Sequence, residues 1–262
     1  MMNMDGLDPG ILGPALLAGI LVLTTHVPMG IKVLERGIVF IDLAIAQVAG
    51  VGIIGADMLG LPMHGSSVQI VATATALSGA LLLAWLEKYY ARSLEALIGI
   101  LFVLAASIGI ILLSKNPHGG EYLKDLLVGQ ILWVNPHDLI PTALIYACIL
   151  AIWFVFRARI TGILFYVMFA ITVTASVQLI GVYLVFASLI IPALTVMRMQ
   201  RFRLLSGYGL GIAGYAIGLC VSAIFDLPTG AIIVCSIAAS SLLFSRVLNI
   251  IPGNNCTEEP CV

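Results

Sequence analysis

The sequence predicts an all-α polytopic membrane protein with eight or nine transmembrane helices. Of its 262 residues, 61% are hydrophobic and only 10% are charged, and the mean hydropathy is +1.14. A soluble globular domain is usually about half apolar and about a quarter charged. The composition therefore excludes a disordered chain, a nucleic-acid binder with a basic face and an ordinary cytosolic enzyme.

The predicted spans are the stretches that carry few or no charges. Most approach the roughly 20 residues that a helix needs to cross hydrocarbon. The stretch 160–197 is too long for one crossing, so we expect Gly181 to divide it into two segments, the second ending around Pro192. We expect one transmembrane domain over 1–250 and a short cytosolic tail over 251–262. In chain order the stretches are 11–31, 37–56, 66–86, 96–114, 139–156, 160–197, 204–225 and 227–245.

The basic residues predict the orientation of these spans. With nine crossings and an extracytoplasmic N-terminus, ten of the twelve Lys and Arg residues fall on the cytosolic side. This distribution follows the positive-inside rule and favours nine crossings over eight. The first ten residues carry two Asp and no basic residue, so we expect the first span to be retained. The ten cytosolic residues are Lys32, Arg36, Lys88, Arg92, Arg157, Arg159, Arg198, Arg201, Arg203 and Arg246.

The second span, 37–56, carries the candidate site. It is rich in Gly and Ala, and small residues allow close approach between helices, or between a helix and a permeating ion. Asp42 and Gln47 lie inside this span, where both are costly unless they face the bundle interior or a pathway. They lie about 140° apart around a straight helix, so one ion meets both only if the helix is distorted or a second subunit contributes. The alternative is that both make helix-packing contacts.

No catalytic motif is present. The chain has no glycine-rich phosphate loop ending in Gly-Lys-Ser/Thr, no His-Glu-x-x-His helix and no Gly-x-Ser-x-Gly elbow. Asp42 is the only carboxylate well inside a span, which disfavours a proton-driven pump with a carboxylate relay. We expect this chain to perform no covalent chemistry. His26, beside Pro28, is interpreted as a packed, hydrogen-bonded residue, and the alternative is a contact at the exit side of the pathway.

The order of several segments resembles one family, the membrane permeases of zinc/manganese/iron-type metal-ion importers of the ATP-binding-cassette (ABC) class. The resemblance covers nearly the whole chain, and it rests on order and spacing rather than on one motif. Its segments are Pro28-Met29-Gly30 followed by Lys32 and Arg36, the small-residue span Phe40 to Gly52, SLEALIGILFVLAASIGIILLS from Ser93, VGQILWVNPHDL from Val128, VQLIGVYLVFASLIIPALTV from Val177 and YAIGLCVSAIFDLPTGAIIV from Tyr215.

The resemblance implies an ABC importer permease-like bundle that works by alternating access as a homodimer in the bacterial cytoplasmic membrane. Each copy is expected to bind one cytosolic ABC ATPase, and an extracytoplasmic metal-binding protein is expected to deliver Zn²⁺ or Mn²⁺. The metal is a substrate, no permanent cofactor is expected, and Asp42 and Gln47 are the expected transit ligands. The alternative is a self-sufficient secondary carrier or channel.

Two features depart from the family pattern. The family usually carries an Asp and a His four residues apart in the second span, and an ungapped match places Leu43 and Gln47 there. The family also has a longer cytosolic segment where this chain has only the residues RAR, at 157–159. If that segment contacts the ATPase, the contact moves to Arg198, Arg201 and Arg203. The alternative for these arginines is anchoring at the membrane surface.

The extracytoplasmic loops are the last predicted site. His64, His118 and His137 fall there, accompanied by Glu121 and Asp138. Imidazole and carboxylate groups suit divalent metals, so these residues form a predicted relay from the binding protein into the pore. The alternative is that they are ordinary polar loop residues.

Overall fold

The computed structural model describes residues 8–60, 66–114, 119–156, 160, 162–199 and 201–250. These residues form helices, and no β-strand occurs among them. In chain order the helices are α1 (Pro9–Arg36), α2 (Ile41–Met58), α3 (Ser66–Tyr90), α4 (Leu94–Leu113), α5 (Gly119–Val128), α6 (Pro136–Val155), α7 (Ile163–Ile180), α8 (Val182–Val196), α9 (Arg203–Phe225) and α10 (Thr229–Ile250), with short 3₁₀ turns at Ala91–Ser93 and Ile131–Trp133.

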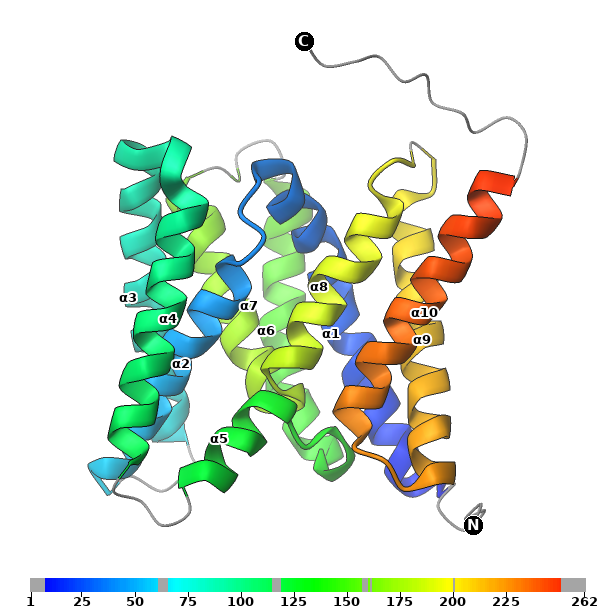
Figure 1. The fold of residues 1–262 in the computed structure, drawn as a ribbon, viewed down its shortest axis with the longest axis horizontal. Coiled ribbons are helices and arrows are strands. Elements are labelled where there is room, and N and C mark those ends of the chain that lie inside the picture. The colour runs from blue at the N-terminus through cyan, green and yellow to red at the C-terminus, as the bar shows by residue number, and fades with distance from the viewer. Residues whose placement is uncertain are drawn as a thin grey trace.

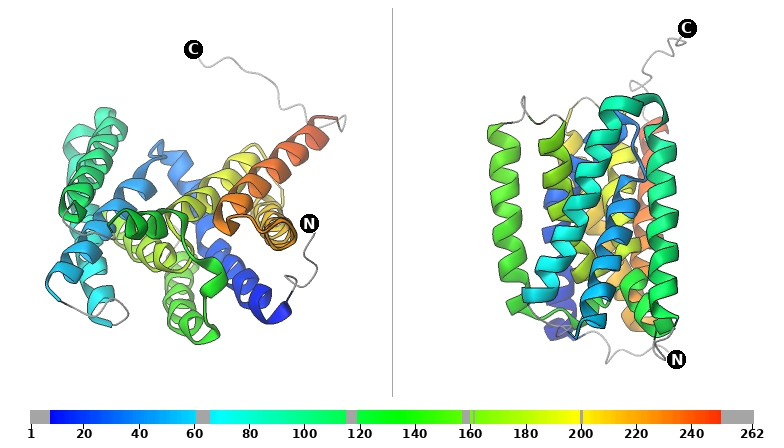
Figure 2. Two further views of the ribbon diagram at one scale, coloured as in Figure 1. Left: turned by 60° about the horizontal axis from the view of Figure 1, so that its bottom comes forward. Right: turned by 90° about the vertical axis from the view of Figure 1, so that its left-hand side faces the viewer.

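The long helices run alongside one another between two ends of the molecule, and the short α5 lies at one end (Figures 1 and 2). The helices α2, α4, α5, α8 and α10 lie on the side that faces the viewer in Figure 1, with α1 and α6 behind them. The first helix begins at the end where α5 lies, and α10 finishes at the other end. The predicted all-helical class is therefore confirmed.

The number of crossings differs from the prediction of eight or nine. Six segments of the described chain are long and apolar enough to cross a membrane. One of them, Ser67–Leu113, contains both α3 and α4, because the 3₁₀ turn at Ala91–Ser93 joins these helices with little interruption. Two further apolar helices, Leu139–Val155 and Val182–Val196, are shorter than a typical span.

The break between α7 and α8 occurs at Gly181, as predicted. Gly181 has φ +81° and ψ 161°, a conformation that is essentially restricted to glycine. It packs against Gly129, which follows α5 and also has a positive φ of +73°. The expected end of the second segment at Pro192 was wrong, because α8 continues through Pro192 to Val196. Membrane helices tolerate proline where neighbouring groups satisfy the freed carbonyl.

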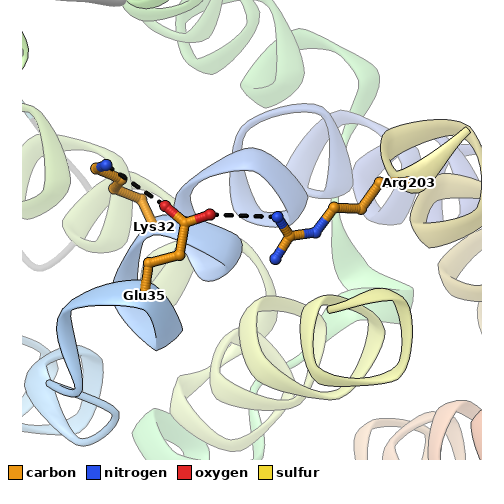
Figure 3. A network of polar contacts seen from close by, with 3 residues as sticks. All are labelled: Lys32, Glu35 and Arg203. Atoms are coloured by element: carbon orange, nitrogen blue, oxygen red, sulfur yellow. Dashed lines mark hydrogen bonds and ion pairs between the residues drawn. The ribbon is translucent and has the colours of Figure 1, made fainter. Parts of the chain in front are cut away.

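The basic residues that were predicted to be cytosolic, where they are described, lie at the end of the molecule opposite α5. The end of α1, the α3–α4 turn, the α8–α9 connection and the end of α10 all lie there (Figure 1). The Glu35 carboxylate lies 3.2 Å from the Arg203 guanidinium and 3.4 Å from the Lys32 ammonium group (Figure 3). The pair with Arg203 connects α9 to α1. Arg36 lies 3.9 Å from Glu87 of α3. The Arg203–Glu35 and Arg36–Glu87 pairs connect separate helices at one surface of the bundle.

Candidate functional site

A cavity of about 600 Å³ lies beside α2. Its walls come from α2, α4, α5, α8 and α10, which are far apart in the sequence and lie on one side of the bundle (Figure 1). The wall is mainly aliphatic and aromatic, with Phe102 from α4, Leu127 from α5 and Phe186 from α8. Cavities of roughly 300–1,000 Å³ with such walls are typical of small-molecule sites.

Helix α2 presents Leu43 and Gln47 to this cavity. Residues four apart in a helix lie on the same face, so the two side chains meet the cavity one above the other. These are the two positions at which the family resemblance expects metal ligands. The small residues of α2 serve helix packing on its other faces. Gly52 packs against Thr75 of α3, and a side chain at Gly50 would come within 2.9 Å of Leu126 of α5.

Gln47 and Asp42 are both buried, but they do not meet in one cavity. Gln47 is 6% exposed as a whole residue, lines the cavity and makes no hydrogen bond within the described part of the chain. Asp42 is fully buried, does not line the cavity and has no hydrogen-bond partner on either carboxylate oxygen among the described residues. This separation agrees with the angle between the two positions on a straight helix.

Asp42 occupies the first turn of α2 rather than the middle of a span. Helix α2 begins only at Ile41, because Gly37 ends α1 in the left-handed conformation and the chain then turns. The N-terminus of a helix carries a partial positive charge that favours a carboxylate. The helix dipole therefore offsets part of the cost of burying Asp42.

A buried polar network that the sequence did not predict joins α1, α6 and α7. The His26 Nδ1 lies 2.9 Å from the Val22 carbonyl oxygen, and its Nε2 lies 3.1 Å from the Ser176 hydroxyl. Ser176 donates to the Thr172 carbonyl at 2.7 Å, and the Tyr146 hydroxyl donates to the same carbonyl at 3.3 Å. His26 is thus a packed, hydrogen-bonded residue, as predicted. The network links residues up to 150 positions apart, and no local pattern reveals such a pairing.

The predicted metal relay lies mostly where the structure gives no side-chain description. His64 and His118 fall outside the described residues, and the side chains of Glu121 in α5 and Asp138 in α6 are likewise not described. His137 is exposed at the start of α6. Within the described part of the chain, no group of three or more His, Cys, Asp or Glu residues could hold a metal ion. The relay remains a prediction.

A second cavity, of about 830 Å³, lies at the charged end between α1, α6 and the α8–α9 connection. Arg198 and Arg203 line it, and Arg201 lies exposed on the same connection. Phe202, between these arginines, is 73% exposed and has a left-handed backbone with φ +56°. A positive φ is unusual for a bulky residue, and backbone strain of this kind is concentrated at functional sites. The three predicted arginines therefore share one surface.

Comparison with known proteins identifies the family. Residues 10–165 and 157–248 match the model of the ABC 3 transport family. The chain is 25% identical to the high-affinity zinc uptake system membrane protein ZnuB of Haemophilus influenzae, over 86% of this chain and 94% of that protein. It is 28% identical to the manganese transport system membrane protein MntC of Halalkalibacterium halodurans, over 87% of this chain and 83% of that one.

A solved structure shows the same fold. PsaBC from Streptococcus pneumoniae, in complex with Fab, matches with a TM-score of 0.74 and 23% identity, over 96% of both chains. At 23% identity this match shows only that the two folds are similar. The family is identified by the family model, which matches nearly the whole chain. The chain belongs to the ABC 3 transport family and is a membrane permease of the metal-type ABC transporters.

Proposed function

We propose that this chain is the permease subunit of an ATP-driven importer that moves a divalent metal across the bacterial cytoplasmic membrane. The family match over both halves of the chain carries this proposal. Zinc is the first candidate because of the resemblance to a zinc uptake protein, and manganese or iron comes after it. The chain would leave ATP hydrolysis to a separate subunit, since it lacks a phosphate-binding loop.

The proposed mechanism is alternating access in a homodimer. The cavity beside α2 is open on one side of the protomer, and a second copy would complete it as a central pathway. Leu43 and Gln47 face that cavity, so we assign the contact with the cargo to Gln47. Asp42 lies on another side of α2, and a direct contact between Asp42 and the cargo requires α2 to turn during the cycle.

The ATPase is proposed to bind the charged end of the molecule. Arg198 and Arg201 are exposed there, beside the exposed ring of Phe202. Arg203 pairs with Glu35, so it holds the start of α9 against α1. An extracytoplasmic metal-binding protein would bind the opposite end, where His137 is exposed at the start of α6.

Uptake measurements in cells test this proposal against a self-sufficient carrier or channel. Cells that express the permease alone should accumulate no zinc or manganese above background. Co-expression of the partner ATPase and the binding protein should give uptake, and an ATPase that cannot hydrolyse ATP should remove it. Accumulation by the permease alone would show that it is a secondary carrier or a channel.

A further inference from the structure

The second cavity, at the charged end of the molecule, combines a surplus of positive charge with apolar walls. Four of its thirteen lining residues are charged, three of them basic and one acidic, so the lining carries a net charge of +2. The other nine lining residues are aliphatic, aromatic, Met or Pro. A cavity of about 830 Å³ with both kinds of wall suits an amphipathic ligand that carries a negative charge. The charged residues are Lys32, Glu35, Arg198 and Arg203.

The basic groups of this cavity have donors to spare. Glu35 pairs with both Lys32 and Arg203, so one carboxylate serves two cations (Figure 3). The Nε of Arg203 is buried and has no hydrogen-bond partner among the described residues. Arg198 is exposed and makes no ion pair or hydrogen bond within the described part of the chain. Charge-assisted hydrogen bonds to an anionic group would satisfy these donors.

The apolar wall of the cavity belongs to a helix at the edge of the bundle. Helix α6 packs mainly against α1 and α7, and it lies at the edge of the bundle in Figure 2. Its exposed apolar side chains include Leu144, Ile152 and Val155, which indicates a surface in contact with lipid. Trp153 and Phe154, near the end of the same helix, line the cavity. Aromatic residues in such a position are typical of the boundary between membrane and water.

We propose that the second cavity binds an anionic phospholipid of the cytoplasmic leaflet. The lipid phosphate accepts hydrogen bonds from Lys32 and Arg203, and the adjoining part of an acyl chain packs against Trp153 and Phe154. Basic pockets between transmembrane helices on the cytoplasmic side are typical sites for anionic headgroups. A free phosphate shares the headgroup chemistry, but it would gain nothing from the apolar wall. An acidic segment of the ATPase is the rival occupant, because the proposed ATPase surface adjoins the cavity.

Fluorescence quenching by brominated lipids tests the proposal. Trp85→Phe and Trp133→Phe replace two exposed residues outside the cavity and leave Trp153 as the only Trp. The purified full-length chain, in micelles of neutral detergent, is titrated with phosphatidylglycerol or phosphatidylcholine that carries bromine on its acyl chains, since bromine quenches indole on contact. Half-maximal quenching should need at least about tenfold less phosphatidylglycerol, because several basic groups attract it. Equal quenching by the two lipids would overturn the inference.

Substitutions of opposite charge sharpen the test. Lys32→Met removes one basic group and keeps an unbranched apolar chain, so the preference for phosphatidylglycerol should fall about fivefold. Glu35→Gln removes the carboxylate that competes for the same cations, so the preference should rise by about the same factor. Lys88→Met, at the same end but outside the cavity, is the matched control and should change nothing. An unchanged preference in Lys32→Met, or a fall in both cavity variants, would overturn the inference.

Two competition measurements separate the lipid from the other occupants. Inorganic phosphate, compared with chloride at the same ionic strength, should leave the quenching by brominated phosphatidylglycerol unchanged. Relief of quenching by phosphate would assign the cavity to a soluble anion and overturn the inference. Addition of the partner ATPase should also leave the quenching in place. Loss of quenching when the ATPase binds would assign the cavity to the ATPase, and it would overturn the lipid site while supporting the proposed importer.

Discussion

At the scale of single residues, helix α2 contributes Leu43 and Gln47 to the wall of the cavity. The nearest carboxyl group in the sequence, that of Asp42, lies one residue before Leu43. The carboxylate lies at 42 and is buried away from the cavity, whereas Leu43 and Gln47 face it. Asp42 has no hydrogen-bond partner among the described residues, and burying an unpaired carboxyl group is costly. Asp42 therefore contributes little stability of its own, and its position in the first turn of α2 limits that cost.

Replacing Asp42 with Asn tests whether its carboxyl group is used in transport. The substitution keeps the shape of the side chain and removes the ionisable carboxyl group. We expect the melting temperature of the purified permease to stay the same or rise, and uptake to stay within about twofold, since no partner loses a charged contact. Thermal unfolding in detergent and ATP-driven uptake measure the two effects. A folded Asp42→Asn protein without uptake would show that the carboxylate acts on the cargo.

At the scale of helices, the bundle depends on close contact between the end of α5 and the α7–α8 break. Gly129 and Gly181 both have positive φ, and a side chain at either would overlap the backbone of the other segment. This contact fixes the start of α8 beside α5. Because α5 and α8 both line the cavity, the contact also sets the shape of the site.

Substitution of Gly181 by Ala should destabilise this contact. The backbone conformation alone costs roughly 1–3 kcal/mol for a residue other than glycine, before the overlap with Gly129 is added. We expect a lower melting temperature and a reduced yield of folded permease. Gly209→Ala is the matched control, since an added side chain there meets open space within α9. It should be neutral or stabilising by about 0.5–1 kcal/mol. Equal stability of the two variants would contradict the role of the α5–α8 contact.

The long helices and one helix break are local properties of the chain, whereas the cavity is not. Runs of apolar residues predicted the long helices, and Gly181 predicted the α7–α8 break, because both are local properties of the chain. The helix α5 was not predicted, since 119–128 is too short and polar for a span. The cavity was not predicted either, because five helices from distant segments form it. The direction of Gln47 could not be predicted from the sequence either, because it depends on how α2 packs against other helices, chiefly α3 and α4.

At the scale of the whole molecule, the charge asymmetry gives the protein two different ends. The described basic residues that were predicted to be cytosolic belong to segments at one end, and they connect α1, α3 and α9 through ion pairs. Surface ion pairs contribute little stability individually. Their position is therefore better explained by orientation in the membrane and by the proposed binding of the ATPase.

The double variant Arg198→Ala/Arg201→Ala tests the proposed ATPase surface. Loss of both charges should reduce the amount of ATPase that co-purifies with the permease at least severalfold, and more strongly at low salt, because exposed charges are screened. Lys88→Ala removes an exposed charge from α3, at the same end but away from the second cavity, and should have no effect. Normal co-purification of the double variant would place the ATPase elsewhere on this end.

The most direct test of the importer is zinc or manganese uptake into proteoliposomes that contain purified permease and ATPase, with the binding protein on the opposite side. Metal should accumulate only when ATP is present on the ATPase side, and Gln47→Ala should lower the rate about tenfold while the ATPase stays bound. Accumulation by the permease without ATPase or ATP, or full activity of Gln47→Ala, would contradict a pathway beside α2 that is driven by a partner's ATP hydrolysis.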